Sequence, residues 1–398
     1  MNQFLVRCDQ SDQIIQVPAN ITSSQLKILF NLDDNVFLYV NGNMIIESLE
    51  KSLKDDINTE NVKIINIVKE KGSQPAEFCS SVISGHTGPV LACLQFTYNK
   101  IKYFVTAGSD KTVRFWDLIT KTQFKVNINH NHWVLVLEEL EDYIISGGMD
   151  SIICVYDKSG NFVQSIHKFT KGVIKLVKIK QNEFVAGGRD GLLCYFKIVN
   201  NKNVEIINIY RYSSSVSDIK INNHMIVSSY TNGIVKLFTI NTMDYIKDLD
   251  TNNVRINCIG IFQDIIIIGD DLGHITIYKD TKVLFRMSHK REVISIDIDP
   301  NGFNFISGSF DKTIKGWSLQ TGKCLFTIYH VNYVYKIKYL NDLVISAGKD
   351  KLIKIYKPSI NKIVGSFVTK DEIYDFVCDN KNIIAVSKDS NVYFYSST

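Results

Sequence analysis

The chain has 398 residues, of which 45% are hydrophobic and 22% charged, and its formal net charge is +4. These values are typical of a folded protein with enough apolar material for two to three domains, and they exclude a mostly disordered chain. The excess of 45 Lys and Arg over 41 Asp and Glu is too small to indicate nucleic-acid binding by the chain as a whole, so any basic surface is expected to be local.

Targeting signals and cysteine pairs are also missing from the sequence. The eight cysteines are dispersed without a Cys-x-x-Cys pair, and the first residues lack the basic and apolar regions of a signal peptide. The longest apolar runs, such as residues 265–268, are far shorter than a membrane span. We therefore expect a soluble intracellular protein with reduced cysteines and no membrane partner.

Residues 1–70 have the pattern of a small α+β domain. Thr22-Ser-Ser-Gln25 has the form of a capping box that opens a helix, and Asn41-Gly42 is a strong turn between two short strands. The predicted elements follow the order ββα, two short strands, short helix, β, at residues 4–8, 13–17, 22–32, 36–40, 43–46, 48–55 and 62–68. This order resembles the ubiquitin-like (β-grasp) fold. Residues 71–77 are predicted to be a short linker.

The rest of the chain repeats with a period of 39 to 42 residues. The string Gly108-Ser-Asp-Lys-Thr-Val-Arg-Phe-Trp116 recurs with variations, and each copy contains short β-rich runs separated by Gly, Asn and Asp turns. Eight copies end on an aromatic residue: Trp116, Tyr156, Phe196, Phe238, Tyr278, Trp317, Tyr356 and Tyr395. The pattern resembles the WD-repeat family. We predict a mainly β chain, with an eight-bladed WD-repeat β-propeller over residues 78–398 after the ubiquitin-like domain.

In the WD-repeat family, a loop His, a Ser or Thr, a turn Asp and a strand Trp form a hydrogen-bonded tetrad. The resemblance carries this role onto the first and sixth repeats, with His86, Thr106, Asp110, Trp116 and His289, Ser307, Asp311, Trp317. It also carries it onto the second and seventh repeats, with tyrosine for tryptophan, in His130, Ser146, Asp150, Tyr156 and His330, Ser346, Asp350, Tyr356.

The other repeats depart from this pattern, for example with Asn232, Leu272 and Thr369 at tetrad positions, and are expected to rely on packing alone. Because a His/Ser/Asp set that recurs around a ring is structural whereas a catalytic triad is unique, we predict no catalytic residue and no enzyme activity. No pair of Asp and His has zinc-ligand spacing.

The eighth repeat stops after its third strand. Residues 78–83, just before the first repeat, are predicted to supply the missing outer strand and so to close the ring.

A ubiquitin-like domain that leads into an eight-bladed propeller resembles the Notchless family of large-subunit ribosome assembly factors. The resemblance covers nearly the whole chain and is weakest in the third to fifth repeats. The N-terminal extension and the mid-propeller insertion that are usual in the family are not found in this sequence. Four strings carry it: Ile57-Asn-Thr-Glu60, Ser80-Ser-Val-Ile-Ser-Gly-His-Thr87, His130-Asn-His-Trp-Val-Leu135 and Ser288-His-Lys-Arg-Glu-Val293.

This resemblance implies a non-catalytic factor of the nucleus and nucleolus that is a monomer within a large complex. Its propeller would bind the pre-60S particle, and its ubiquitin-like domain would dock the AAA+ ATPase midasin for ATP-driven remodelling. The matching loop residue is Glu60, whose carboxylate would complete a Mg²⁺ site supplied by midasin, and no intrinsic cofactor is implied.

Candidate partner-binding residues on the propeller are two tyrosines and three cations. Tyr335 and Tyr374 are expected near neighbouring blade mouths, where they serve either a protein contact or channel lining and core packing. Arg189, Lys349 and Lys388 each precede a turn Asp and would place positive charge on one rim. Together with a stripe of lysines at 171–180, these cations would either contact rRNA phosphates or form a face that is solvated or locally neutralised by acidic residues.

Two other functions compete with this prediction. One is a WD-repeat substrate adaptor of a ubiquitin ligase, against which stands the lack of an F-box-like helical segment before the propeller. The other is the sister nucleolar ubiquitin-like/propeller assembly factor, whose ring has seven blades, whereas eight closing aromatics are present here.

Overall fold

The computed structural model describes residues 3–8, 14–32, 36–40, 43–45, 49–52, 64–71, 78–200 and 203–396. The predicted Asn41-Gly42 turn, most of the predicted linker and Glu60 lie outside these residues.

The described N-terminal residues form a five-stranded mixed sheet with two short helices. The elements are β1 (Gln3–Cys8), β2 (Ile14–Pro18), α1 (Ser23–Leu29), β3 (Val36–Val40), β4 (Asn43–Met44), α2 (Leu49–Ser52) and β5 (Ile64–Lys71). The strand order is β2-β1-β5-β3-β4, and β1 and β5 are parallel. Thr22 and Gln25 cap α1 reciprocally, each side chain accepting the other's backbone N–H. The helix buries Leu26 in a core with Val6, Leu38 and Ile67.

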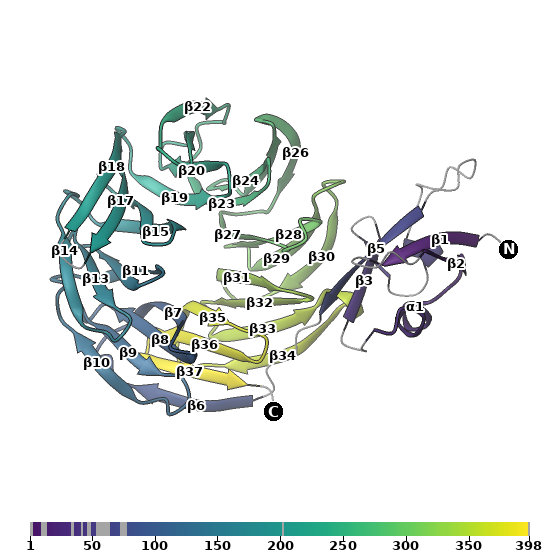
Figure 1. Ribbon diagram of the computed structural model, residues 1–398, viewed down its shortest axis with the longest axis horizontal. Coiled ribbons are helices and arrows are strands. Elements are labelled where there is room, and N and C mark those ends of the chain that lie inside the picture. The colour runs from purple at the N-terminus through teal and green to yellow at the C-terminus, as the bar shows by residue number, and fades with distance from the viewer. Residues whose placement is uncertain are drawn as a thin grey trace.

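From Phe78 onward, the described chain forms eight four-stranded antiparallel sheets, which lie around a ring (Figure 1). The predicted eight-bladed propeller is therefore confirmed. Each blade runs from an innermost strand a to an outermost strand d.

The strands of blades 1 to 4 are as follows. Blade 1 has β7 (Val90–Tyr98), β8 (Ile101–Gly108), β9 (Val113–Asp117) and β10 (Gln123–Asn127). Blade 2 has β11 (Val134–Glu139), β12 (Tyr143–Gly148), β13 (Ile153–Asp157) and β14 (Phe162–Ile166). Blade 3 has β15 (Val173–Lys180), β16 (Glu183–Gly188), β17 (Leu192–Asn200) and β18 (Asn203–Arg211). Blade 4 has β19 (Val216–Ile221), β20 (Met225–Tyr230), β21 (Val235–Thr239) and β22 (Tyr245–Leu249).

The second half of the ring repeats the same plan. Blade 5 has β23 (Ile256–Phe262), β24 (Ile265–Asp270), β25 (His274–Lys279) and β26 (Lys282–Ser288). Blade 6 has β27 (Val293–Ile298), β28 (Asn304–Ser309), β29 (Thr313–Ser318) and β30 (Cys324–Tyr329). Blade 7 has β31 (Val334–Leu340), β32 (Leu343–Gly348), β33 (Leu352–Lys357), a 3-10 turn at Pro358–Ile360 and β34 (Lys362–Val368). Blade 8 has β35 (Ile373–Cys378), β36 (Asn382–Ser387), β37 (Asn391–Ser396) and β6 (Phe78–Ser84).

Burial along each strand depends on its distance from the ring axis. The second strand of blade 2, β12, is buried at every position because blades pack against both of its faces. The outermost strand of blade 3, β18, instead alternates between exposed and half-buried side chains. The second strands of blades 3 and 7, β16 and β32, are likewise buried at every position, whereas an innermost strand such as β11 mixes buried and half-buried side chains.

The two ends of the propeller meet in blade 8. Strand β6 pairs antiparallel with β37, with Val82 opposite Tyr393 and Ile83 opposite Val392. Blade 8 then packs on blade 1, where the Phe394 ring lies edge-on to Phe104 with centroids 5.2 Å apart. The ring is thus closed by a strand that precedes the first blade in the sequence.

Candidate partner-binding face of the propeller

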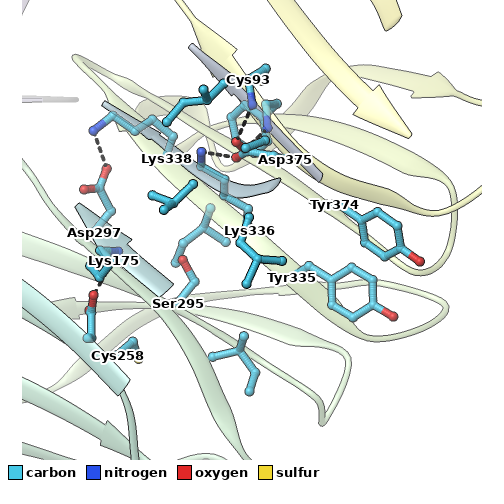
Figure 2. A pocket seen from close by; sticks show the side chains of 18 of the residues that line it. Cys93, Lys175, Cys258, Ser295, Asp297, Tyr335, Lys336, Lys338, Tyr374 and Asp375 are labelled. Atoms are coloured by element: carbon cyan, nitrogen blue, oxygen red, sulfur yellow. Dashed lines mark hydrogen bonds and ion pairs between the residues drawn. The ribbon is translucent and has the colours of Figure 1, made fainter. Parts of the chain in front are cut away.

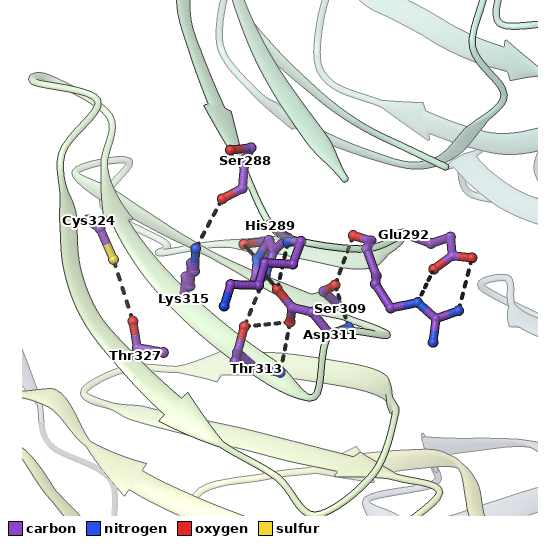
Figure 3. Close-up of polar contacts among 12 residues, drawn as sticks. Ser288, His289, Glu292, Ser309, Asp311, Thr313, Lys315, Cys324 and Thr327 are labelled. Atoms are coloured by element: carbon purple, nitrogen blue, oxygen red, sulfur yellow. Dashed lines mark hydrogen bonds and ion pairs between the residues drawn. The ribbon is translucent and has the colours of Figure 1, made fainter. Parts of the chain in front are cut away.

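The tetrad of blade 6 is a continuous chain of hydrogen bonds. Trp317 Nε1 donates to Ser307 Oγ at 2.7 Å, and Ser307 Oγ lies 2.7 Å from His289 Nε2. His289 Nδ1 is 2.9 Å from an Asp311 oxygen (Figure 3). One arrangement of protons satisfies every group: the hydroxyl donates to Nε2 and the Nδ1–H donates to the carboxylate, so the imidazole is neutral.

Blade 1 contains the same chain of bonds, in Trp116, Thr106, His86 and Asp110, with distances of 2.8, 2.8 and 2.9 Å. Burial lowers the pKa of His86, which agrees with a neutral ring. The Thr106 and Ser307 side chains are fully buried, so neither hydroxyl is open to a substrate. The geometry of these sets is that of a structural network.

Asp311 holds two loops of blade 6 together. It accepts hydrogen bonds from the Lys290 N–H before strand a and from the Thr313 hydroxyl at the start of strand c. Burial opposes its ionisation, but the hydrogen bonds from His289, Thr313 and the Lys290 N–H outweigh burial and hold the pKa of Asp311 well below its ordinary value.

The tyrosine-containing sets of blades 2 and 7 differ from each other. In blade 2, His130 lies 2.9 Å from Asp150 and 2.8 Å from Ser146, whose hydroxyl has a weak 3.5 Å contact with Tyr156. In blade 7, His330 keeps Asp350 at 2.8 Å and Ser346 at 2.9 Å. The Tyr356 hydroxyl, however, donates to Asn361 and not to Ser346, because the phenol extends past the hydroxyl toward the next turn. The prediction that Tyr356 completes a tetrad is therefore wrong.

The prediction that the divergent blades rely on packing alone is also wrong for blade 8. The Tyr393 hydroxyl takes the place of the missing imidazole. It donates to Asp389 at 2.5 Å and accepts the Lys370 N–H at 3.0 Å. Because Tyr393 lies on strand c, this replacement of the imidazole could not be predicted from the Thr369 position.

Blade 4 has a polar centre of its own as well. The buried Lys236 ammonium lies 2.8 Å from Asp248 and 4.4 Å from the centre of the Tyr212 ring. Tyr212 stands where other blades have the loop histidine, and its hydroxyl accepts a hydrogen bond from Asn232 at 3.1 Å. An ion pair with cation–π contacts replaces the tetrad here.

Tyr335 and Tyr374 belong to a half-buried aromatic cluster at the mouth of the central channel. Their rings stack with centroids 6.0 Å apart, and both point away from the charged groups deeper in the channel (Figure 2). Phe310 contacts Tyr335 edge-on at 6.1 Å and stacks on Tyr333 at 4.7 Å. The two tyrosines of strand a were expected from the sequence. Phe310 and Tyr333, which lie in the loops just before strands c and a, were not.

The cations beside this cluster are held in different ways. Lys349 lies 5.4 Å from the centre of the Tyr333 ring, and Lys388 lies 3.3 Å from a Glu372 oxygen. Glu372 also accepts the Tyr335 hydroxyl at 3.1 Å, and burial together with this bond raises the pKa of Tyr335. Arg189 is separate from both lysines and lines a pocket of blades 3 to 5.

The lysine stripe predicted at 171–180 does not form one surface. Lys175 points into the channel and pairs with Asp218 at 2.9 Å, while Lys180 lies 3.6 Å from Glu183. The alternation of the strand separates these side chains.

The central channel is a cavity of about 640 Å³ lined by strand a of every blade. Asp375 accepts the Lys336 ammonium of the preceding blade and the Cys93 N–H of the following blade, at 3.0 Å for the latter (Figure 2). Asp218 occupies the same position in blade 4 and accepts Lys175 at 2.9 Å and the Ile259 N–H at 2.9 Å. Each aspartate thus joins three consecutive blades, on opposite sides of the ring.

The two described α-helices, α1 and α2, have seven and four residues and are too short to cross a membrane. Among the described residues, no three His, Cys, Asp or Glu side chains are grouped so as to hold a metal ion.

Comparison with known proteins supports the repeat analysis. The family model "WD domain, G-beta repeat" matches residues 77–117 and 281–318. Ribosome biogenesis protein YTM1 of Saccharomyces cerevisiae is 24% identical over 318 residues, which cover 69% of this chain and 68% of that protein. YTM1 of Candida glabrata is 24% identical over 245 residues, 54% of this chain and only 52% of that protein. The match therefore spans about half to two thirds of these relatives.

Solved structures show the same fold. Sqt1 of Saccharomyces cerevisiae superposes with a TM-score of 0.74 at 10% identity, covering 81% of this chain and 100% of that one. Chaetomium thermophilum Sqt1, solved bound to the N-terminus of ribosomal protein L10, has a TM-score of 0.73 at 14% identity and covers 80% of this chain and 99% of that one. By these comparisons the chain is similar to WD-repeat proteins and to ribosome biogenesis protein YTM1, and it has a β-propeller fold.

Proposed function

We propose that the chain is a non-catalytic assembly factor of the large ribosomal subunit that works in the nucleus and nucleolus. The observation that carries this proposal is the match, over 69% of this chain, to relatives named ribosome biogenesis proteins. The propeller would bind the pre-60S particle. A half-buried aromatic cluster with flanking cations, such as that around Tyr335 and Tyr374, is the type of surface that dominates the energetics of protein interfaces.

The N-terminal domain would dock the remodelling ATPase. Its strand order β2-β1-β5-β3-β4, with β1 parallel to β5, supports a ubiquitin-like fold. Glu60 lies in the sequence between α2 and β5, outside the described residues. A carboxylate is a hard oxygen donor of the kind that Mg²⁺ prefers, so Glu60 would complete a Mg²⁺ site in a midasin-type AAA+ partner.

The test is affinity purification of the full chain with Glu60 intact and with Glu60→Asp, which shortens the arm by one methylene group. We expect the wild-type chain to recover pre-60S particles together with the ATPase, and Glu60→Asp to recover the particles without the ATPase. Glu50→Asp, at an exposed position of α2, is the matched control and should recover both. Retention of the ATPase by Glu60→Asp would contradict the docking role. Failure of the wild-type chain to recover particles would contradict the assembly role.

A further inference from the structure

A pocket of about 510 Å³ lies among the loops of blades 3, 4 and 5, apart from the aromatic cluster. Its polar lining comes from two arginines, three hydroxylated residues and one amide: Arg189, Arg255, Ser215, Ser217, Thr231 and Asn257.

A hydrogen bond that occurs in all eight blades shows why the pocket is there. In each blade, the backbone N–H of the first residue after strand b donates to the carbonyl of the residue just before strand a. In blade 4 these two residues are Thr231 and Ser215, at 2.9 Å. The same two positions hold Met149 and Trp133 in blade 2, and Lys349 and Tyr333 in blade 7.

The second residue of strand a also lines the pocket, and it too is smaller in blade 4 than in blade 7. It is Ser217 in blade 4 but Tyr335 in blade 7. Blade 4 therefore has three small hydroxylated side chains where blade 7 has Lys349, Tyr333 and Tyr335, and the pocket lies beside these small side chains.

The neighbouring blades place an arginine on each side of this space. Arg189 stands in blade 3 at the position of Thr231, and Arg255 stands in blade 5 at the position of Ser215. Both arginines are exposed, and within the described part of the chain neither forms an ion pair. The backbone of Arg189 is held by Ser215, whose hydroxyl donates to the Arg189 carbonyl at 2.6 Å.

This arrangement contrasts with the cations of blades 6 and 8. Arg291 lies 3.2 Å from Glu292, and Lys388 lies 3.3 Å from Glu372, so their charges are locally neutralised. Three acidic residues lie next to lining positions. Asp190 accepts hydrogen bonds from Thr170, and Asp218 pairs with Lys175 in the channel. Asp271 follows strand b of blade 5 and accepts a hydrogen bond from Asn257 at 2.7 Å.

Further cations continue the positive surface on either side. Lys171 and Lys290 lie in the loops that lead into strand a of blades 3 and 6; both are exposed, and no ion pair involves them among the residues that the structure describes. The four cations are spread over blades 3, 5 and 6. Cations that are spaced along a surface can each pair with a different phosphate of a polynucleotide backbone. Recognition of a single isolated phosphoryl group would instead require the cations to converge on one point.

We propose that this pocket binds a backbone phosphate of single-stranded RNA. The Arg189 and Arg255 guanidinium groups donate to phosphate oxygens, and the blade 4 hydroxyls offer further donors. Lys171 and Lys290 contact neighbouring phosphates. The inference rests on the proposed function, because the precursor particle is the source of the RNA, and it assigns the rRNA contact to one side of the propeller.

The experiment measures binding of a 5′-fluorescein-labelled oligouridylate of about 12 nucleotides to the full chain by fluorescence anisotropy, between about 50 and 200 mM salt. We expect the double variant Arg189→Gln/Arg255→Gln to bind at least about 10-fold more weakly. The slope of log K against log salt should fall by about 1.4, which corresponds to two lost phosphate contacts on a single strand.

Two further variants keep the test free of folding effects. Asp271→Asn removes the neighbouring negative charge and is expected to tighten binding about 2- to 3-fold, a gain that misfolding does not produce. Lys279→Gln/Lys282→Gln removes two exposed positive charges from the hairpin at the far end of blade 5, and should leave affinity and salt slope unchanged.

Unchanged affinity and slope in the arginine double variant would overturn the inference. So would a phosphoserine peptide that competes with the oligouridylate more strongly than unlabelled oligouridylate does, because the pocket would then belong to a phosphoprotein partner. Recovery of pre-60S particles distinguishes this outcome from failure of the proposed function. If the chain recovers particles but its affinity for RNA does not depend on Arg189 and Arg255, only the inference is refuted.

Discussion

The hydroxyl on strand b is the central group of each tetrad. Ser307 accepts the Trp317 indole N–H and faces His289, so its loss leaves a buried donor and a buried ring nitrogen without partners. Ser346 in blade 7 faces His330 at 2.9 Å, but the Tyr356 hydroxyl bonds elsewhere. Comparison of these two serines isolates the contribution of the indole.

We expect Ser307→Ala to lower the free energy of unfolding by about 2–3 kcal/mol, and Ser346→Ala by only about 1 kcal/mol, because an unsatisfied buried donor is added only in blade 6. Guanidinium unfolding curves of the two variants measure the difference. Equal losses would show that the indole hydrogen bond contributes nothing to stability.

At the scale of the element, strand β6 decides whether the ring is closed. It covers the edge of β37, which would otherwise expose a row of unpaired N–H and C=O groups, and its Ile83 packs against the cluster shared by blades 1 and 8. Phe78 lies opposite Ser396, so β6 and β37 pair like the two strands of a β-hairpin, although no turn joins them.

Deletion of residues 78–84 is therefore expected to lower the melting temperature by about 10 °C or more, through the loss of a strand and the exposure of apolar surface. Appending the same seven residues after Thr398 through an Asn-Gly turn should restore the melting temperature, because the pairing with β37 is antiparallel. A melting temperature that does not change on deletion would refute this role of β6.

At the scale of the whole molecule, Asp218 and Asp375 stiffen the ring from inside the channel. Each is an acceptor for a lysine of the preceding blade and for a backbone N–H of the following blade. Because the two residues lie four blades apart, the two clamps together span six of the eight blades. Both clamps are centred on blades with divergent tetrads, blades 4 and 8.

We expect Asp375→Ala to cost about 3 kcal/mol of unfolding free energy, since it leaves Lys336 and the Cys93 N–H without an acceptor in the channel. Lys102→Gln, which removes a half-exposed partner of Asp379, is the control and should cost less than about 1 kcal/mol. Chemical denaturation measures both; a loss for Asp375→Ala no larger than the control would show that the clamp is not stabilising.

The sequence by itself determined the number of blades, the capping box at Thr22, and the contacts of His with Ser or Thr in blades 1, 2, 6 and 7. These features depend on local patterns: the 39- to 42-residue repeat, the Gly and Asp turns, and, in blades 1, 2, 6 and 7, a His placed four residues before the first valine of strand a. In blade 1, the bonds among His86, Thr106, Thr112 and Trp116 join residues only 10 to 26 positions apart.

Only the tertiary structure decided which side chains meet across blades. Asp375 and the Cys93 N–H are 282 positions apart in the chain and become neighbours because the ring closes. The blade 4 pocket and the Phe310–Tyr333 pair likewise depend on how equivalent positions of adjacent blades turn toward the axis or the rim. Local sequence sets the strands and turns, whereas contacts between blades follow from the closure of the ring, which no single repeat contains.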